Sequence, residues 1–280
     1  MRLIIPAAGV GVRFAGTGGP LPKCLIPISG RPIISHLFRM ASATGLFSQI
    51  VIILGPYYET VLETIQGLAS SISWTSKTEI LCLRNRDFAR TNSIYSIYLA
   101  RDFLEGDVLI HDSDVLVAHP LFETVATKRV PNSAWVLAEK MPSIPEDETK
   151  VVTNSDDQVI QIGERDIPSK TAQGRFIGLS HFSSGATELF RDEIMSLVGR
   201  GVIGTYYTAA IKLLAEHKML FTVWSDGRPW FEIDTLDDLR SLDPEAKEQI
   251  TQQIPHHKNA RVRAIIRTLE QDNRSHNEFA

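Results

Sequence analysis

The first part of the chain alternates short apolar runs with segments of helical spacing, and this order limits the fold more than any other feature. Residues 3–7 form a continuous apolar run with the length of a strand that is buried on both faces. Three further runs of this kind lie at residues 50–54, 80–83 and 108–110. Because segments with helical spacing separate the four runs, the β-α-β-α-β-α-β order predicts a parallel sheet with right-handed crossovers.

The pattern changes after about residue 131. Shorter strands and two long helices are expected there, with strands at residues 134–138, 151–152, 159–162, 176–179 and 221–224 and helices near residues 186–198 and 206–216. We therefore predict an α/β fold with a mixed, mostly parallel Rossmann-like sheet that is sandwiched by helices. One domain is predicted over residues 1–243, in halves of residues 1–130 and 131–243, and a C-terminal helical tail is predicted over residues 244–280.

The composition is that of an ordinary globular protein, with 43% hydrophobic and 22% charged residues among 280. The formal net charge is −4, so the charge balance does not favour nucleic acid as a partner. The most basic stretch holds Arg261, Arg263 and Arg267, and we expect a solvated helix face there. Neither a spanning run of about 18 apolar residues nor a signal-peptide pattern is present. Cys24 and Cys82 lack metal-ligand spacing, and we expect a cytoplasmic protein without a membrane partner.

The segment after the first apolar run combines small residues with two cations. Its first residues are Ala7, Ala8, Gly9, Val10 and Gly11. Small residues let backbone N–H groups lie close to phosphate oxygens, and Arg13 and Lys23 can neutralise phosphate charge. The glycine spacing fits neither the P-loop nor the dinucleotide fingerprint, which argues against an ATPase and a dehydrogenase. We predict that this segment grips a nucleoside triphosphate, and the alternative is a plain strand-to-helix turn.

Two acidic pairs stand where predicted strands end. Asp112 and Asp114 follow the run at residues 108–110, and Glu232 and Asp234 precede a predicted helix. Carboxylate oxygens are ligands for hard cations such as Mg²⁺, and a cation that bridges phosphates takes carboxylates from more than one loop. The alternatives are a turn that the aspartates stabilise and a helix cap at Asp234. Ligands of parallel sheets bind beyond the carboxyl ends of the strands, where the first pair and the glycine-rich segment should meet.

A polar loop enters a helix near residue 92. Asn85, Asn92 and Ser93 could read the edge of a nucleotide base from this loop. The alternative is that they serve only as loop and cap residues.

Three residues of the second half are candidates for contact with a second substrate. Lys150 and Arg175 could each hold a further phosphate, and the alternative for Lys150 is a solvated side chain. Tyr207 is either a core residue or part of an aromatic wall for a cationic substrate.

Taken in order, these motifs resemble a known superfamily. Residues 5–13 together with Pro22 and Lys23 resemble the opening of the nucleotidyltransferases that activate sugar phosphates and related phospho-alcohols. Residues 85–98 and the late acidic motif from Glu232 are similar to those of the phosphocholine cytidylyltransferase-like branch. The resemblance implies a fold of the nucleotide-diphospho-sugar transferase type. It also implies CTP and Mg²⁺, with transfer of CMP to a phosphate-bearing acceptor and release of pyrophosphate.

The resemblance also implies roles for individual residues. Lys23 and Arg13 would be catalytic, and Asp114, Glu232 and Asp234 would bind the metal. The nucleotide would be held by Ala7, Ala8, Gly9, Val10, Gly11, Asn92 and Ser93. From the residues themselves we add Asn85 and Asp112 at the nucleotide, and Lys150, Arg175 and Tyr207 near the acceptor. Arg175 stands where an acidic residue is expected in this branch, and an arginine suits an anionic substrate.

We expect the anionic oxygen of a small phospho-alcohol or phosphonate to attack the α-phosphorus of CTP in line, with positioning and charge neutralisation as the main catalytic effects. One alternative is a sugar-1-phosphate nucleotidyltransferase that uses another nucleotide. A second alternative is a non-catalytic, nucleotide-binding regulatory protein. The tail could pack on the domain or on a second subunit, so a homodimer stays open.

Overall fold

The computed structural model describes residues 1–9, 11, 22–128, 131–252, 254 and 265–269. Four parallel strands form the first half of its central sheet, in the spatial order β6 (Val108–His111), β1 (Arg2–Ala7), β4 (Gln49–Leu54) and β5 (Glu79–Arg84). They are the four apolar runs of the sequence, and their parallel pairing is the predicted one.

The second half continues the same sheet with mostly antiparallel pairing. Its members are β8 (Ala134–Lys140), β9 (Lys150–Thr153), β10 (Val159–Gly163), β11 (Gly174–Phe182) and β12 (Leu220–Trp224). Strand β11 joins the halves, because it pairs antiparallel with β8 along one side and with β6 and β9 along the other. The sheet is therefore mixed, as predicted.

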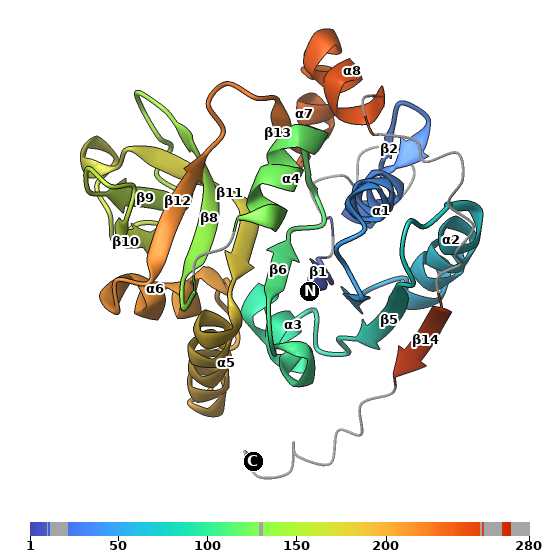
Figure 1. Ribbon diagram of the computed structural model, residues 1–280, viewed down its shortest axis with the longest axis horizontal. Coiled ribbons are helices and arrows are strands. Elements are labelled where there is room, and N and C mark those ends of the chain that lie inside the picture. Colours follow the sequence, from blue (N-terminus) through green and yellow to red (C-terminus); the bar gives the residue numbers. More distant parts are fainter. Residues whose placement is uncertain (10, 12–21, 129–130, 253, 255–264, 270–280) are drawn as a thin grey trace.

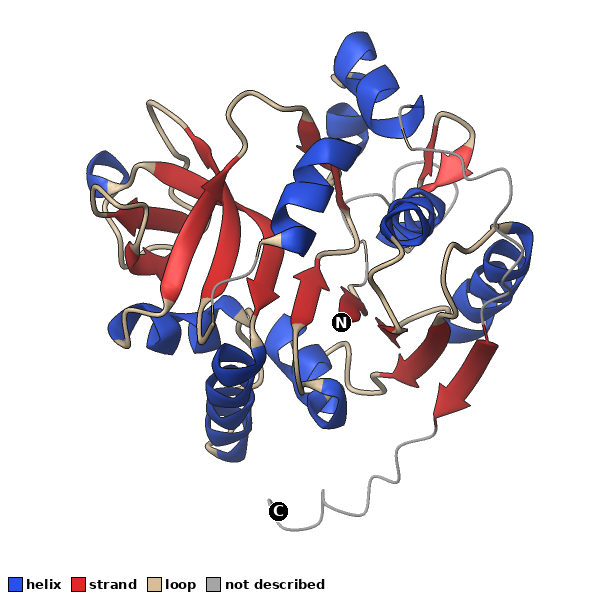
Figure 2. Ribbon diagram, viewed as in Figure 1, coloured by secondary structure: helices blue, strands red, loops and turns tan. Residues whose placement is uncertain are grey.

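Helices cover both faces of this sheet (Figures 1 and 2). One face carries α1 (Ile33–Thr44), α2 (Tyr58–Ser71) and α4 (His119–Thr127), and the other carries α3 (Ser93–Leu99), α5 (Ser184–Gly199) and α6 (Thr208–Glu216). Side chains alternate along a strand, so Leu3 and Ile5 of β1 enter the first core while Ile4 enters the second. This double burial explains why the strands read as continuous apolar runs, and the predicted fold class is confirmed.

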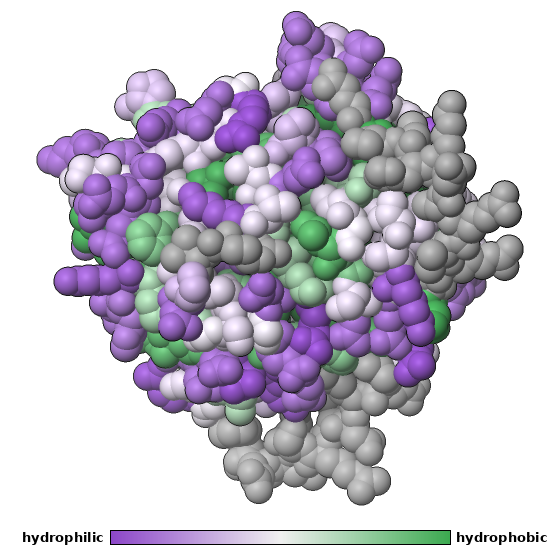
Figure 3. Space-filling view, viewed as in Figure 1, coloured by the Kyte–Doolittle hydropathy of each residue, from purple (hydrophilic) through white to green (hydrophobic). Residues whose placement is uncertain are grey.

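Polar side chains cover most of the face seen in Figure 3, and apolar ones reach it only in small, separate areas. In the described part of the chain, no helix combines the length and the apolar character that crossing a membrane requires.

A small second sheet connects two distant segments at the rim of the large one. Strand β7 (Val115–Val117) pairs antiparallel with β13 (Trp230–Glu232), and Glu232 lies opposite Val115. The other short elements are β2 (Pro27–Ile28), β3 (Arg31–Pro32), α7 (Leu236–Arg240) and three 3₁₀ turns at Lys23–Leu25, Arg101–Phe103 and Ser169–Thr171. Neither β7 nor α4 was expected from the sequence, since each is short and follows another apolar strand almost directly.

The prediction of a helical tail over residues 244–280 is wrong in part. Helix α8 (Pro244–Gln252) is present, but β14 (Ile265–Leu269) is a strand that pairs parallel with β5. The outer edge of β5 offers unpaired backbone groups, and the tail satisfies them. Arg267 therefore lies on a strand and not on the expected helix face, where its Nε is 3.1 Å from a carboxylate oxygen of Glu79. The tail adds a strand to the sheet of the domain that we predicted to end at residue 243.

Gly55 permits a close approach between the end of β4 and the loop after β1. A Cβ atom at Gly55 would lie 2.4 Å from the carbonyl oxygen of Ala8. We expect Gly55→Ala to lower the free energy of unfolding by about 1–3 kcal/mol, measured by urea denaturation, because the backbone of Ala8 must move. As the control, Gly67→Ala in α2 meets no atom within 4 Å and should stabilise the protein by about 0.5–1 kcal/mol. Equal effects of the two substitutions would contradict this account.

Candidate active site

A cavity of about 530 Å³ opens at the rim where the loops after β1 and β6 meet. Both loops lie at the carboxyl ends of parallel strands, which is where ligands of such sheets bind. Ala7, Ala8 and Gly9 line one side of the cavity, and Lys23 lies beside them. Val10 and Arg13 fall outside the described residues, and their predicted contacts with a nucleotide stay predictions.

Lys23 lies between two carboxylates that come from distant parts of the chain. Its Nζ donates to Oδ2 of Asp114 at 2.7 Å and also to Oδ1 of Asp234. Burial opposes the charged form of Lys23, but the charge of Asp114 and the hydrogen bonds to both carboxylates outweigh it and raise the lysine pKa above its ordinary value. The ammonium is therefore held charged at neutral pH.

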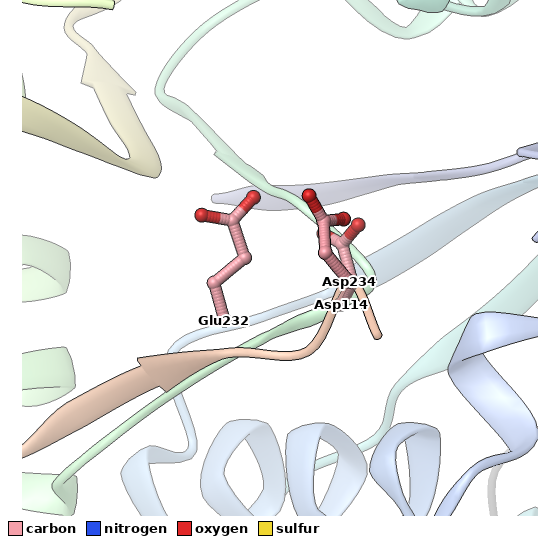
Figure 4. Close-up of side chains that lie close together, drawn as sticks. All are labelled: Asp114, Glu232 and Asp234. Atoms are coloured by element: carbon pink, nitrogen blue, oxygen red, sulfur yellow. The ribbon is translucent and has the colours of Figure 1, made fainter. Parts of the chain in front are cut away.

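Asp114, Glu232 and Asp234 converge on one point (Figure 4). A carboxylate oxygen of each residue lies within 4.8 Å of one from each of the others. The pairing of β7 with β13 brings them together, since Ile233 donates its N–H to the carbonyl of Asp114 at 3.0 Å. Three carboxylates form a donor set that suits a hard divalent cation, so the residues present fit a metal site.

Hydrogen bonds in the segment after Asp234 fix the backbone that carries the Asp234 carboxylate. Thr235 is the N-cap of α7, and its hydroxyl accepts from the N–H of Asp238. The carboxylate of Asp238 in turn accepts from the N–H groups of Asp234 at 2.9 Å and of Thr235 at 2.6 Å. The helix cap is therefore Thr235, and the alternative that Asp234 serves as the cap is wrong.

Glu232 shares the carboxylate cluster and has a strongly altered acidity. Burial, followed by the charges of Asp114 and Asp234, raises the pKa of Glu232 to about 7. Arg175 opposes the shift through an NH2 group that lies 3.3 Å from Oε2 of Glu232. Near neutral pH, Glu232 is therefore partly protonated as long as no cation offsets the charges of Asp114 and Asp234.

The acidity of Glu232 predicts a pH-dependent stability of the metal-free protein. Its pKa is higher in the folded protein than the ordinary 4.5, so it stabilises the fold below that value and loses this contribution as the pH rises to about 7. We expect Glu232→Gln to gain stability relative to the wild type over this interval, measured by urea denaturation with a chelator present. Glu188→Gln, at an exposed position of α5, should show a constant difference. A constant difference for Glu232→Gln as well would contradict the pKa assignment.

Asp112 lies in the floor of the cavity. Its N–H donates to the carbonyl of Gly178 at 2.9 Å, and a Cβ atom at Gly178 would lie 2.9 Å from its Oδ2. The φ angle of Gly178 is +88°, a positive value that residues with a Cβ atom rarely adopt. Burial raises the pKa of Asp112 well above its usual range, and the charges of Asp114 and Glu232 raise it further. Asp112 lines the cavity, but its contact with a nucleotide stays a prediction.

Tyr207 lies behind Asp112 and is a core residue, with 2% of its surface exposed. Burial and the neighbouring Asp112 raise the pKa of its hydroxyl well above 10. Its backbone N–H donates to Oγ of Ser93 at 3.1 Å. The neighbouring Tyr206, for which the sequence left the same two alternatives open, is 47% exposed and also lines the cavity.

The polar loop before α3 also lines the cavity, and its side chains mostly stabilise the loop itself. The amide nitrogen of Asn85 donates to the hydroxyls of Thr91 and Ser96, at 3.1 and 3.3 Å. Asn92 is the N-cap of α3, since its Oδ1 accepts from the N–H of Ser93 at 2.7 Å. The cap alternative is thus confirmed for Asn92, while reading of a base by this loop stays a prediction.

Lys150 and Arg175 do not offer free cations to an acceptor. Lys150 is fully buried, and its ammonium donates to the backbone carbonyls of Glu146 and Glu164. Arg175 donates to the carboxylates of Glu148 and Glu232, and its guanidinium lies 4.6 Å from the ring centre of Trp230. The structure therefore does not support the predicted contact of Lys150 with an acceptor, and it shows Arg175 already paired with two acids.

The described residues that line the cavity are strongly acidic. They include one ammonium, that of Lys23, and seven carboxyl groups, those of Asp112, Asp114, Asp147, Glu148, Glu164, Glu232 and Asp234. Asp147, Glu148 and Glu164 lie outside the carboxylate cluster and the loop after β6, and we call these three residues the acidic wall. The sequence analysis missed this wall, because acidic residues in loops without regular spacing carry no signal of a site.

The fold is that of nucleotidyltransferases of known structure. The inositol-1-phosphate CTP transferase of T. maritima superposes with a TM-score of 0.71 and 16% sequence identity, over 91% of this chain and 98% of that one. This similarity confirms the predicted type of fold.

Two of the curated relatives are a synthase named for a CMP-linked product and a cytidylyltransferase. The chain is 28% identical over 255 residues, 87% of its length, to CMP-5'-(3-aminopropyl)phosphonate synthase of Streptomyces rubellomurinus. It spans only 38% of the length of that relative. It is also 23% identical to the choline-phosphate cytidylyltransferase of Streptococcus pneumoniae, over 89% of this chain and 100% of the relative. These relatives confirm the resemblance noted from the sequence. A comparison with protein-family models finds no match.

Proposed function

We propose that the chain is a cytidylyltransferase that transfers CMP from CTP to a small phosphate- or phosphonate-bearing acceptor and releases pyrophosphate. One observation carries the proposal: Lys23 and the cluster of Asp114, Glu232 and Asp234 share one end of the cavity, beside the loop after β1. An ammonium and a candidate metal site at this place suit the charge of a bound triphosphate.

The mechanism that we propose is a direct displacement at the α-phosphorus of CTP. An anionic oxygen of the acceptor forms the new P–O bond, and the bond from the α-phosphorus to the oxygen that bridges it to the β-phosphorus breaks. Pyrophosphate leaves with that electron pair. Because the attacking oxygen is already deprotonated near neutral pH, the step needs no general base.

The residues of the site would stabilise charge during this step. Lys23 would donate its N–H groups to phosphate oxygens, and its raised pKa keeps it cationic. Arg13, carried over by resemblance, would act with it. A divalent cation held by Asp114, Glu232 and Asp234, which we propose to be Mg²⁺, would supply Lewis-acid polarisation of the phosphates.

We further propose that the acceptor carries an amine at the end away from its phosphate or phosphonate group. The acidic wall of Asp147, Glu148 and Glu164 supports this, together with the exposed ring of Tyr206. Arg175 suits an anionic group, but it pairs with Glu148 and Glu232, so Asp147 and Glu164 support an amine more than Glu148 does. The Streptomyces relative is named for an aminopropyl phosphonate product.

A pyrophosphate-release assay tests the proposal. CTP, UTP, GTP and dTTP would each be combined with 3-aminopropylphosphonate, phosphocholine and glucose 1-phosphate, at equal Mg²⁺. We expect release with CTP and one of the two acceptors that carry a cationic nitrogen, 3-aminopropylphosphonate or phosphocholine. Release with another nucleotide and glucose 1-phosphate would support the sugar-1-phosphate alternative, and CTP binding without any release would support a regulatory protein.

We also propose a cytoplasmic location. A homodimer is a further proposal, which a measurement of mass in solution would test.

A further inference from the structure

The acidic wall of the cavity is built from two separate segments. Asp147 and Glu148 come from the loop before β9, and Glu164 comes from the turn that follows β10. Neither segment is a helix, so the backbone positions of these residues depend on contacts between the segments.

Lys150, the first residue of β9, contacts the backbone of both segments. Its side chain is fully buried, at 0% exposure. The ammonium donates to the carbonyl oxygens of Glu146 at 2.8 Å and Glu164 at 2.9 Å, with the carbonyl of Glu148 at 3.5 Å. One buried group thus contacts the backbone on both sides of the wall.

A buried ammonium is costly unless its donors are satisfied. An ammonium has three donors, and the three carbonyl groups correspond to them. The segments are therefore arranged around this charge, and an apolar side chain of equal length would leave the carbonyls without their donors.

Contacts around Lys150 also involve residues of the acidic wall. In the sheet, Lys150 lies opposite Gly163 of β10 and Arg175 of β11. Arg175 binds the carboxylate of Glu148, while Lys150 lies at its carbonyl. Lys150 thus positions the backbone of the wall, and Arg175 orients one of its carboxylates.

From this geometry we infer that Lys150 is a positioning residue, which sets the affinity for the acceptor without touching it. The inference rests on the proposed function only in naming the occupant of the cavity. Its structural content is that Lys150 holds the two loop segments that carry the acidic wall.

The kinetic test is Lys150→Met, which keeps an unbranched side chain as far as Cε and removes the ammonium. We expect the KM for the acceptor to rise by about tenfold or more, while the KM for CTP stays within about twofold. Lys150→Arg, which restores donors, should recover most of the acceptor affinity. The control is Lys77→Met, at an exposed position of the loop before β5, which should leave both KM values unchanged. Equal increases of both KM values would overturn the inference.

A second measurement does not depend on activity. Hydrogen exchange of the ligand-free protein should become about tenfold faster in residues 141–149 and 164–168 of Lys150→Met, and it should stay unchanged in β1 and β4. Unchanged exchange in these two segments would overturn the inference. If the wild type transfers CMP to no acceptor, the proposed function fails and exchange alone decides the role of Lys150. If Lys150→Met does not fold, Lys150→Gln replaces it in both measurements with the same criteria.

Discussion

Replacing Lys23 by alanine is expected to lower turnover by about 10²- to 10³-fold, because the substitution removes a preorganised cation from a site where charge develops. The ammonium is held by Asp114 at 2.7 Å and by Asp234, so it costs little reorganisation during the reaction. Its side chain is 17% exposed, which strengthens its interaction with a bound phosphate relative to that of a solvated lysine. The measurement is the steady-state rate of pyrophosphate release at saturating CTP and acceptor.

The control for this substitution is Lys140→Ala, at an exposed position at the end of β8. It removes the same charge and should leave turnover unchanged. Circular dichroism must show that Lys23→Ala is folded, since the substitution also leaves two carboxylates close to each other. Unchanged turnover of a folded Lys23→Ala would show that Lys23 is not catalytic, whatever the family of the chain.

Replacing Asp234 by asparagine is the second prediction with a large effect. Asp234 belongs to the carboxylate cluster and also binds Lys23. We expect the Mg²⁺ concentration for half-maximal activity to rise by about tenfold or more, with a loss of turnover of about 10²-fold. The asparagine keeps the shape of the side chain and the contacts of Asp238 with the backbone.

Direct binding of Mn²⁺, followed by its paramagnetic resonance signal, separates the two roles of Asp234. Loss of both turnover and Mn²⁺ binding would support a metal ligand. Loss of turnover with normal Mn²⁺ binding would contradict the metal assignment and leave Asp234 as a partner of Lys23. Asp237→Asn is the matched control, since this carboxylate is 90% exposed and pairs only with Arg240 among the ion pairs of the described residues. It should change neither quantity.

Much of the fold could be predicted because the strands of the first half are buried on both faces. Residues such as Ile4 and Ile5 enter opposite cores, so the strand reads as a continuous apolar run in the sequence. Strand β14 could not be predicted, because its partner is the edge of β5, about 180 positions earlier in the chain. A run of five residues is also too short for the spacing of its apolar side chains to distinguish a strand from a helix.

Some residues of the candidate site could likewise be predicted from the sequence, and others could not. Lys23, Asp114 and Asp234 were found because their residue types stand at the ends of elements, and the structure places them in contact. Lys150 was misread, since a lysine near acidic residues reads as a solvated or ligand-binding cation. Its burial depends on the carbonyls of Glu146 and Glu164, and backbone groups of other segments leave no trace in the sequence.

The sequence by itself determined the order of strands and helices, the small residues after β1 and the kinds of charged groups at the strand ends. Local patterns encode these features, because apolar periodicity and residue size act on neighbouring positions. Only the tertiary structure decided which charges are available to a ligand. The pairing of β7 with β13 brings Glu232 and Asp234 to Asp114, while the folding of β9, β10 and β11 commits Lys150 and Arg175 to contacts within the protein. The physical reason is that the role of a charge depends on the partners that surround it, and those partners come from distant segments.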